Sequence, residues 1–233
     1  MQVAILAGGL ATRLGPMTAT RPKSMLEVAG TPFLAHQLAL LRRHGVDDVV
    51  LCIGHLGAEI RRHFGGGEAF GVRLRYSDEG ERRLGTAGAL KWAEPVLAET
   101  FFVLFGDSYL PLDYRDVLRE FQTRGTPAAM VVYRNQDRYD ASDVDVRDGL
   151  VVRYGREPRS ADLVYINAGL SVLRRETLGT LALERPAGLP ELYRPLIAAK
   201  RLAAIETPQR FYEVGSPGGL EEFRRVVAQG APA

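Results

Sequence analysis

Short apolar runs alternate with helical patterns along the first half of the chain. Apolar runs at residues 2–6, 48–53, 72–76 and 101–105 predict strands, and periodic segments at 32–44, 57–64 and 86–97 predict helices. In the helix at 32–44 the apolar residues recur at spacings of three and four, and Gly45 ends the pattern. Strands that alternate with helices are typical of βαβ units. We therefore predict an α/β fold with a Rossmann-like, mixed and mostly parallel sheet flanked by helices.

The pattern changes after residue 128, where the apolar segments become shorter. Strands are predicted at residues 128–133, 143–147, 150–154, 164–166 and 169–173, followed by helices at 190–200 and 218–228 with a strand at 202–206 between them. Asp148-Gly149 separates two of these strands and predicts a tight hairpin. We expect this region to form a small mixed or antiparallel lobe.

The composition is typical of one globular domain. A chain of 233 residues with 46% apolar residues is long enough to bury most of its unfolded surface. The net charge is only +2 and the basic residues occur as scattered pairs, so nucleic-acid binding is not indicated. The chain has a single cysteine, Cys52, no apolar run of membrane-spanning length, and no charged and apolar leader before Val3. These features predict a cytoplasmic protein that is neither secreted nor inserted in a membrane.

The strand at 2–6 runs into a loop whose composition suits a phosphate. The loop reads Ala-Gly-Gly-Leu-Ala-Thr-Arg-Leu-Gly at 7–15, and Arg-Pro-Lys-Ser-Met-Leu follows at 21–26. Adjacent glycines allow positive φ and close approach of the backbone, so N–H groups can turn toward a phosphate, while Arg13 and Lys23 supply cationic donors. The spacing fits neither the dinucleotide motif G-x-G-x-x-G nor the P-loop. We predict that this segment binds a nucleoside triphosphate.

Lys23 and Asp107 are well suited to phosphate chemistry. Only three of the 30 basic residues are lysines, and a compact ammonium reaches a phosphate cluster where a guanidinium does not fit. Asp107 follows the predicted strand at 101–105, at the edge where ligands bind in open α/β sheets. A carboxylate there can hold Mg²⁺, which takes one or two carboxylates. The simpler alternatives are a solvated loop lysine and a turn cap, although Asp113 already suits the cap of a helix at 114–124.

Several motifs resemble those of the sugar-1-phosphate nucleotidyltransferases. They are Gly-Gly-x-x-Thr-Arg-Leu at 8–14, Pro-Lys-Ser-Met-Leu at 22–26, Leu-Gly-Thr-Ala-Gly-Ala-Leu at 84–90, Gly-Asp-Ser at 106–108, Asn-Ala-Gly at 167–169 and Phe-Tyr-Glu-Val-Gly-Ser-Pro at 211–217. The resemblance spans essentially the whole chain. The chain is similar to small bacterial members, such as the heptose-1-phosphate and mannose-1-phosphate guanylyltransferases. We expect no C-terminal β-helix, which larger members carry.

The resemblance implies a role for each matching residue. The nucleotide would be bound by Leu6, Ala7, Gly8, Gly9, Arg13, Lys23, Glu79, Gly85 and Thr86. Arg13, Lys23 and Asp107 would be the catalytic residues. Mg²⁺ would be held by Asp107 and by Glu213, which stands where many members carry aspartate.

The sugar phosphate would be bound by Gly106, Arg156, Asn167 and Gly169. Asn167 and Gly169 match the segment that contacts the sugar, although Asn167 also suits the cap of a turn. Many members carry Glu-Lys-Pro before this strand, whereas this chain has Tyr-Gly-Arg-Glu-Pro at 154–158. We therefore expect Arg156 to take the place of the lysine, with Arg153 and Arg159 as alternatives.

The reaction implied is Mg²⁺-dependent transfer of a nucleotidyl group from a nucleoside triphosphate to a sugar 1-phosphate, giving an NDP-sugar and pyrophosphate. The segment at 84–90 resembles guanylyltransferases more than thymidylyltransferases, so GTP is expected ahead of UTP and CTP. The alternatives are a UTP- or CTP-dependent enzyme acting on another phosphorylated acceptor, and a regulatory domain that binds nucleotide without catalysis. A glycosyltransferase is less well supported, because Tyr109 occupies the third position of its Asp-x-Asp motif.

One domain is expected to span residues 1–233. Within it, 1–127 would mainly bind the nucleotide, 128–215 would mainly bind the sugar phosphate, and 216–233 would form a C-terminal helix. The chain shows no Ser-His-Asp set, and its histidines, His36, His44, His55 and His63, are interpreted as helix-end or packing residues. We expect a monomer or a homodimer whose partners are the nucleoside triphosphate and the sugar 1-phosphate.

Overall fold

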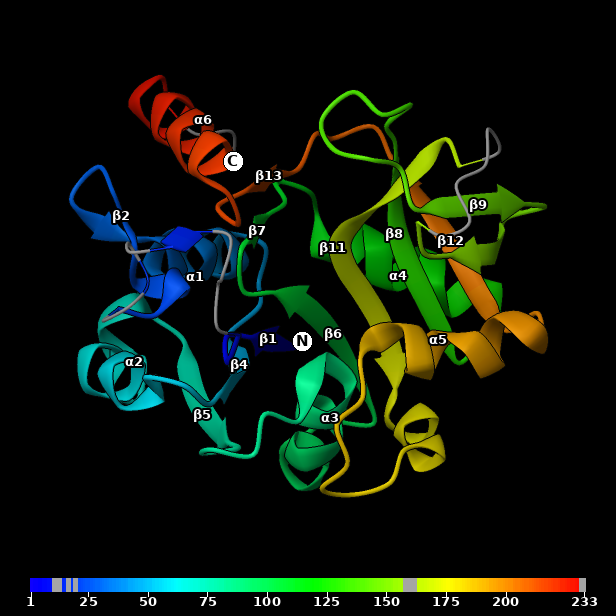
Figure 1. The fold of residues 1–233 in the computed structure, drawn as a ribbon, viewed down its shortest axis with the longest axis horizontal. Coiled ribbons are helices and arrows are strands. Elements are labelled where there is room, and N and C mark those ends of the chain that lie inside the picture. The colour runs from blue at the N-terminus through cyan, green and yellow to red at the C-terminus, as the bar shows by residue number, and fades with distance from the viewer. Residues whose placement is uncertain (10–13, 16–17, 19–20, 157–162, 231–233) are drawn as a thin grey trace.

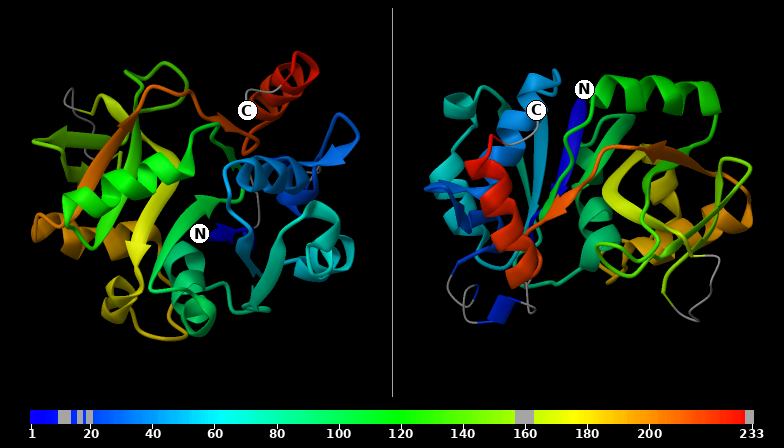
Figure 2. Two further views of the ribbon diagram at one scale, coloured as in Figure 1. Left: turned by 180° about the vertical axis from the view of Figure 1, so that it is seen from behind. Right: turned by 90° about the horizontal axis from the view of Figure 1, so that it is seen from above.

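A nine-stranded sheet runs through the molecule in the strand order β5-β4-β1-β6-β11-β8-β12-β10-β9 (Figure 1). The structure is a computed structural model, which describes residues 1–9, 14–15, 18, 21–156 and 163–230 of the 233-residue chain. Helices cover both faces of the sheet (Figure 2). The predicted α/β class, with a mixed sheet flanked by helices, is confirmed.

The first half of the sheet is parallel and agrees with the predicted strands. Its members are β1 (Gln2–Leu6), β4 (Asp48–Ile53), β5 (Arg73–Asp78) and β6 (Thr100–Phe105). β1 lies between β4 and β6, in registers that place Leu6 beside Cys52 and Phe105. These three strands are apolar on both faces because helices pack on both sides. Their carboxyl ends meet at one edge, where ligands bind in open α/β sheets.

The second half of the sheet is mixed. It contains β8 (Ala128–Arg134), β9 (Val144–Arg147), β10 (Leu150–Tyr154), β11 (Tyr165–Arg174) and β12 (Leu202–Thr207). β11 is antiparallel to both β6 and β8, whereas β12 is parallel to β8. β9 and β10 form the predicted hairpin, in which Asp148 and Gly149 both have positive φ. The predicted lobe is thus continuous with the first half, because β11 pairs directly with β6.

β11 corrects one detail of the sequence analysis. The two short strands expected at 164–166 and 169–173 are one strand of ten residues. Its pairing with β8 shifts register between Asn167 and Ser171, and Gly169 has a φ of 87°. A bulge of this kind leaves residues unpaired without ending the strand, so the apolar pattern is interrupted while the strand continues.

The helices form two layers against the sheet. On the face that carries Val3 and Ile5 lie α1 (Phe33–Arg43), α2 (Gly57–Phe64) and α4 (Tyr114–Arg124). On the face that carries Ala4 lie α3 (Gly85–Ala93) and α5 (Leu189–Ala198). The alternation of side chains along β1 explains why neighbouring residues of one strand belong to opposite layers.

Short 3₁₀ turns complete the connections, namely η2 (Lys23–Met25), η3 (Glu68–Phe70), η4 (Glu94–Val96) and η5 (Arg175–Thr180). The helix predicted at 86–97 leaves the α-helical path at Ala93 and continues as η4, since Pro95 lacks the N–H that an α-helix requires. In the described part of the chain, no helix is long and apolar enough to cross a membrane.

α6 (Pro217–Ala228) brings the end of the chain back to the first half of the fold. It shares a third apolar cluster with α1, where the ring of Phe223 lies 5.2 Å from Phe33 and 4.9 Å from Tyr109 between centroids. Just before α6, β13 (Tyr212–Glu213) pairs with β7 (Ser108–Tyr109), and near the start of the chain β2 (Glu27–Val28) pairs with β3 (Thr31–Pro32). The sequence did not predict these two-residue strands, because they are too short to carry a period.

Candidate functional site

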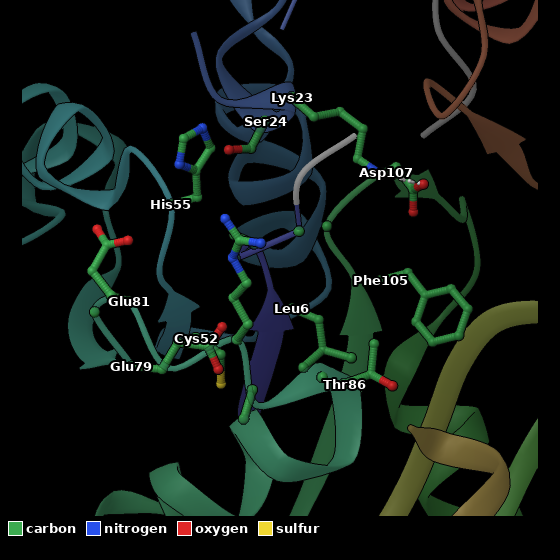
Figure 3. A pocket seen from close by; sticks show the side chains of 18 residues that line it. Leu6, Lys23, Ser24, Cys52, His55, Glu79, Glu81, Thr86, Phe105 and Asp107 are labelled. Atoms are coloured by element: carbon green, nitrogen blue, oxygen red, sulfur yellow. Dashed lines mark hydrogen bonds and ion pairs between the residues drawn. The ribbon is translucent and has the colours of Figure 1, made fainter. Parts of the chain in front are cut away.

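A cavity of about 400 Å³ opens near the carboxyl ends of β1, β4 and β6 (Figure 3). Every residue of the predicted nucleotide site that the structure describes lines it: Leu6, Ala7, Gly8, Gly9, Lys23, Glu79, Gly85 and Thr86. Gly106 and Asp107 line it as well. Arg13 lies outside the described residues. Segments far apart in the sequence thus meet at one edge of the sheet, while their roles stay predictions.

The loop after β1 is held close to its neighbours by the backbone. Ala7 N donates to Cys52 O at 2.8 Å, which extends the pairing of β1 with β4. A Cβ on Gly8 would lie 3.2 Å from Gly54 N, closer than ordinary van der Waals contact, whereas Gly9 faces open space. Neither Gly8 nor Gly9 has positive φ, so the expectation of positive φ at this pair is wrong. Gly8 is required because two backbones approach each other there.

Lys23 and Asp107 form an ion pair beside the cavity. Lys23 Nζ lies 2.6 Å from Asp107 Oδ2 (Figure 3). Lys23 begins η2, whereas Asp107 follows β6, 84 residues later in the chain. The two side chains are only 21% and 15% exposed, so their attraction is less screened than that of a surface pair. The structure thus joins two residues that the sequence singled out separately.

The turn at Gly106-Asp107 is held by backbone hydrogen bonds. Gly106 N donates to Leu6 O at 3.1 Å, and a Cβ on Gly106 would lie 2.3 Å from that same oxygen. Any larger residue at 106 would therefore push β6 away from β1. On the other side, Val214 N donates to Asp107 O at 2.9 Å.

Strand pairing brings Glu213, the second predicted metal ligand, to the same turn. Glu213 lies opposite Ser108 in the pairing of β13 with β7, and its Oε1 accepts a hydrogen bond from Ser216 Oγ at 3.2 Å. No group of three or more His, Cys, Asp or Glu side chains among the described residues is placed to hold a metal ion. Two carboxylates suit Mg²⁺, which completes its shell with phosphate oxygens and water.

Glu79 is a buried carboxylate in the cavity wall. Its side chain is 7% exposed and accepts a hydrogen bond from Leu84 N at 3.2 Å. Burial raises the pKa of Glu79, although the hydrogen bond from Leu84 opposes this shift. Burial, together with the charge of Glu79, raises the pKa of the Cys52 thiol to about 12, so this thiol stays protonated. A Cβ on Gly54 would lie 2.9 Å from Glu79 Cγ, and the glycine makes room for the carboxylate.

The first turn of α3 is capped by the segment before α5. Gly85 has a φ of 72°, and a Cβ on it would lie 2.7 Å from Ala187 O. That carbonyl accepts hydrogen bonds from the N–H groups of residues 87 and 88. Thr86 Oγ1 accepts another from Leu189 N at 2.9 Å. Gly85 and Thr86 therefore each have a structural role besides lining the cavity.

The predicted sugar-phosphate residues other than Gly106 do not line this cavity. Asn167 and Gly169 lie in the bulge of β11, where Asn167 Oδ1 accepts a hydrogen bond from Gly169 N at 2.9 Å. Asn167 thus caps a turn, which is the simpler role expected for it. A Cβ on Gly169 would lie 2.4 Å from Ser108 Oγ, so the bulge packs directly against the residue that follows Asp107.

Arg156 faces carboxylates. Its Nη2 lies 2.6 Å from Asp140 Oδ2, and about half of its side chain is exposed. Burial raises the pKa of the nearby Asp143 carboxyl to about 6, while the hydrogen bond from Asn167 N and the charge of Arg156 oppose this shift. Sequence reasoning found neither acid, because neither belongs to a recognisable motif. Residues 157–162 lie outside the described part of the chain, so the correspondence of Arg156 with the family lysine stays a prediction.

The cavity has further lining residues that sequence reasoning did not assign to it: Ser24, Cys52, His55, Gly80, Glu81, Arg83, Ala89 and Phe105. Ser24 has the clearest sequence signal, since it lies within the motif at 22–26. His55 was expected to be a helix-end or packing residue, and it lies just before α2 with its ring toward the cavity (Figure 3). Loops between predicted strands and helices carry no periodic signal, which is why these residues were not found.

Two curated relatives match most or all of the chain. UTP–glucose-1-phosphate uridylyltransferase from Synechocystis sp. is 31% identical over 194 residues, which is 76% of this chain and 50% of the relative. The catalytic subunit beta of mannose-1-phosphate guanylyltransferase from Danio rerio is 30% identical over 243 residues, which covers 100% of this chain and 67% of the relative. The chain thus spans about half to two thirds of the length of these relatives.

A solved structure shows the same fold. HddC from Yersinia pseudotuberculosis, in complex with GMP-PN, superposes with a TM-score of 0.77 at 25% sequence identity. The match covers 97% of this chain and 99% of that one, so the two folds agree over nearly their full lengths.

A family model described as nucleotidyl transferase matches residues 2–178. The matched range contains the glycine loop, Lys23, the cavity-lining segment at 79–89 and Asp107. The relationship inferred from the motifs is confirmed, and the chain belongs to the nucleotidyl transferase family.

Proposed function

We propose that this chain transfers a nucleotidyl group from a nucleoside triphosphate to a sugar 1-phosphate, giving an NDP-sugar and pyrophosphate. The observation that carries this proposal is the cavity in which the glycine loop, Lys23 and Asp107 meet the segment at 79–89. Its volume of about 400 Å³ is in the range of small-molecule sites. The names of the two curated relatives, a uridylyltransferase and a guanylyltransferase of sugar 1-phosphates, support the same reaction.

The proposed reaction needs little covalent chemistry from the protein. A phosphate oxygen of the sugar 1-phosphate attacks the α-phosphorus in line, and a new P–O bond forms as the bond to the pyrophosphate oxygen breaks. The attacking group is already an anion, so no general base is required, and positioning with charge neutralisation lowers the barrier. In this scheme the N–H groups of residues 7–9 bind the triphosphate, and the Lys23 ammonium transfers from Asp107 to a phosphate.

Asp107 and Glu213 are proposed to hold Mg²⁺. Their fit rests on the pairing of β13 with β7, which carries Glu213 to the turn that contains Asp107. When bound there, Mg²⁺ would neutralise charge on the reacting phosphates. Asp107 is paired with Lys23 in the structure, so transfer of the ammonium to a phosphate would release the carboxylate for the ion.

GTP is proposed as the preferred nucleotide, with a hexose or heptose 1-phosphate as the acceptor. The segment at 84–90 resembles that of guanylyltransferases, and the relative that covers the whole chain is a mannose-1-phosphate guanylyltransferase. HddC, which matches over nearly its full length, was solved with GMP-PN. UTP is the main competitor, because the Synechocystis uridylyltransferase is equally similar over a shorter span.

A pyrophosphate-release assay tests the proposal. ATP, GTP, CTP, UTP and dTTP are each combined with a panel of hexose and heptose 1-phosphates, with and without EDTA. We expect release with GTP and one of these acceptors, abolished by EDTA and restored by excess Mg²⁺. Silence across the panel would favour a regulatory domain that binds nucleotide without catalysis, and release that persists in EDTA would contradict the metal assignment.

A further inference from the structure

Gln37 is a polar residue in the apolar face of α1. Its side chain is only 1% exposed, and its helix neighbours Leu34, Leu38 and Leu41 are fully buried against the sheet. A buried amide in such surroundings is unfavourable unless its polar atoms are used. The position therefore calls for a reason other than packing.

The amide of Gln37 donates to both ends of the turn that carries Asp107. Its Nε2 lies 3.0 Å from Phe105 O and 2.7 Å from Ser108 O. Phe105 ends β6 and Ser108 begins β7, so the two carbonyls flank Gly106-Asp107. One NH₂ group carries two hydrogens and satisfies both acceptors. The orientation of the amide is determined by its partners, because a carbonyl oxygen facing two others would be repelled.

Gln37 completes a set of ties around the turn. Gly106 N is bound to Leu6 O on one side, and Asp107 O accepts from Val214 N on the other. Both of these ties are made by backbone groups, whereas Gln37 supplies a side chain. Its donors hold the carbonyls of residues 105 and 108 together and so determine where the Asp107 carboxylate points.

The other end of the amide supports this reading. Among the described residues, Gln37 Oε1 is buried and has no hydrogen-bond partner. An unpaired buried carbonyl lowers stability, so an apolar side chain of similar size would be favoured at this position if packing were its only role. The two donors are therefore the useful part of this side chain.

We infer that Gln37 is a positioning residue that holds the Asp107 carboxylate in the direction needed for the metal and the triphosphate. The inference rests on the proposed function. It adds a residue on α1, 70 residues before Asp107, to the groups that determine activity.

Gln37→Met tests the inference, because methionine keeps the length of the side chain and removes both donors. We expect kcat to fall by about 10- to 100-fold and half-saturating Mg²⁺ to rise by a similar factor. Binding of Mn²⁺, followed by EPR with a GTP analogue that cannot be cleaved between the α- and β-phosphates, should weaken in parallel. KM for the nucleotide should change much less than the metal requirement.

Gln2→Met is the matched control. Gln2 is also buried, donates to Asp48 Oδ2 at 3.0 Å and accepts from Ala98 N at 2.6 Å, but it lies at the opposite end of β1. Both variants are expected to lower Tm, whereas only Gln37→Met should change the Mg²⁺ requirement. If the two variants lose Tm alike and keep the wild-type Mg²⁺ and Mn²⁺ titrations, Gln37 is merely structural and the inference is wrong.

Gln37→Glu provides a second variant with a pH readout. Burial and the two facing carbonyl oxygens raise the pKa of a carboxyl placed there. The protonated acid can donate one hydrogen bond, and the ionised form can donate none. We therefore expect activity relative to wild type to fall as pH rises from about 6 to about 9. A ratio that does not vary with pH would contradict the inference.

The wild-type protein separates this inference from the proposed function. If wild type binds no Mn²⁺ with the analogue and releases no pyrophosphate, the proposed function is wrong. If wild type does both and Gln37→Met is unchanged, only the positioning role is wrong.

Discussion

The two sides of the candidate site are held in different ways. On the nucleotide side, the backbone sets the geometry, as where Gly106 N donates to Leu6 O and leaves no space for a Cβ. On the side of the predicted sugar-phosphate residues, charged side chains set it, as where Arg156 pairs with Asp140. The first arrangement depends on glycine and on the ends of buried strands. The second depends on which ionisable residues happen to face each other.

This difference explains why the class of reaction is easier to infer than the acceptor. Close approach of two backbones restricts the residue type at one position, so it leaves a short motif in the sequence. A charged pair can be built from other residues at other positions and leaves no fixed spacing. The contrast can be broken or sharpened by substitutions on either side.

Asp107→Asn is expected to have the largest effect, because it removes the charge proposed to hold Mg²⁺ and keeps the shape of the side chain. Pyrophosphate release should fall by about 10³-fold or more, with an unchanged circular dichroism spectrum. Asp145→Asn is the control, since it removes a similarly buried carboxylate that pairs with Arg147 on β9. Normal turnover of Asp107→Asn would remove the basis of the metal assignment.

Lys23→Arg should have the next largest effect, because a guanidinium keeps the charge but is broader than an ammonium. We expect kcat/KM for the nucleotide to fall by about 100-fold. Lys91→Arg is a close control, since Lys91 Nζ also lies 2.6 Å from a carboxylate oxygen, that of Glu94. Equal activity of the Lys23 variant and wild type would show that charge alone matters at this position.

Arg156→Met tests the other side of the site. We expect KM for the sugar 1-phosphate to rise by about 3- to 10-fold, since the guanidinium is half exposed and already paired. KM for the nucleotide should stay near the wild-type value. An unchanged acceptor KM would leave Arg156 only its ion pair with Asp140, and a raised nucleotide KM would contradict the division between the two sides.

Asp143→Asn should have the smallest effect, seen in stability. Burial raises the pKa of Asp143 from 3.8 to about 6, so between these values the folded protein binds a proton that the unfolded chain releases. Its contribution to stability therefore falls as pH rises through this window. We expect the variant to flatten the dependence of Tm on pH there by about 2–6 °C.

Asp48, on the nucleotide half, provides the opposite sign. Burial opposes the shift, but hydrogen bonds from Gln2 and Arg75 lower its pKa, so its stabilising contribution is present above 3.8 and is lost as pH falls through the lowered value. Asp48→Asn should therefore lower Tm at neutral pH and have less effect in acid. The same pH response from both variants would contradict the assignment of these environments.

The sequence predicted the parts of the fold that depend on local patterns. The strands at 2–6 and 48–53 and the helix at 57–64 have the predicted bounds, because apolar periodicity and flanking turn residues act over a few positions. The pairing of β7 with β13 was not predicted, since two residues carry no period. The bulge at Asn167 was read as a break, because an unpaired residue in a strand resembles a loop in the sequence.

The site divides along the same line. The glycine loop, Lys23 and Asp107 were recognisable because their motifs are short and contiguous. The role of Gly8 was expected from backbone conformation, and the structure shows instead that Gly54 lies too close for a side chain. Arg83 and Glu81 line the cavity from a loop without any motif, and Asp143 becomes unusual only through burial.

The sequence by itself determined the alternation of strands and helices, the loop suited to phosphate and the family of the chain, because each of these is encoded in neighbouring residues. Only the tertiary structure decided that Lys23 pairs with Asp107, that Glu213 lies opposite Ser108 and that Gln37 holds the turn between them. Those contacts join residues roughly 70 to 105 positions apart in the chain. They exist because packing of α1, β6 and β13 brings these elements together, and no local pattern specifies such a meeting.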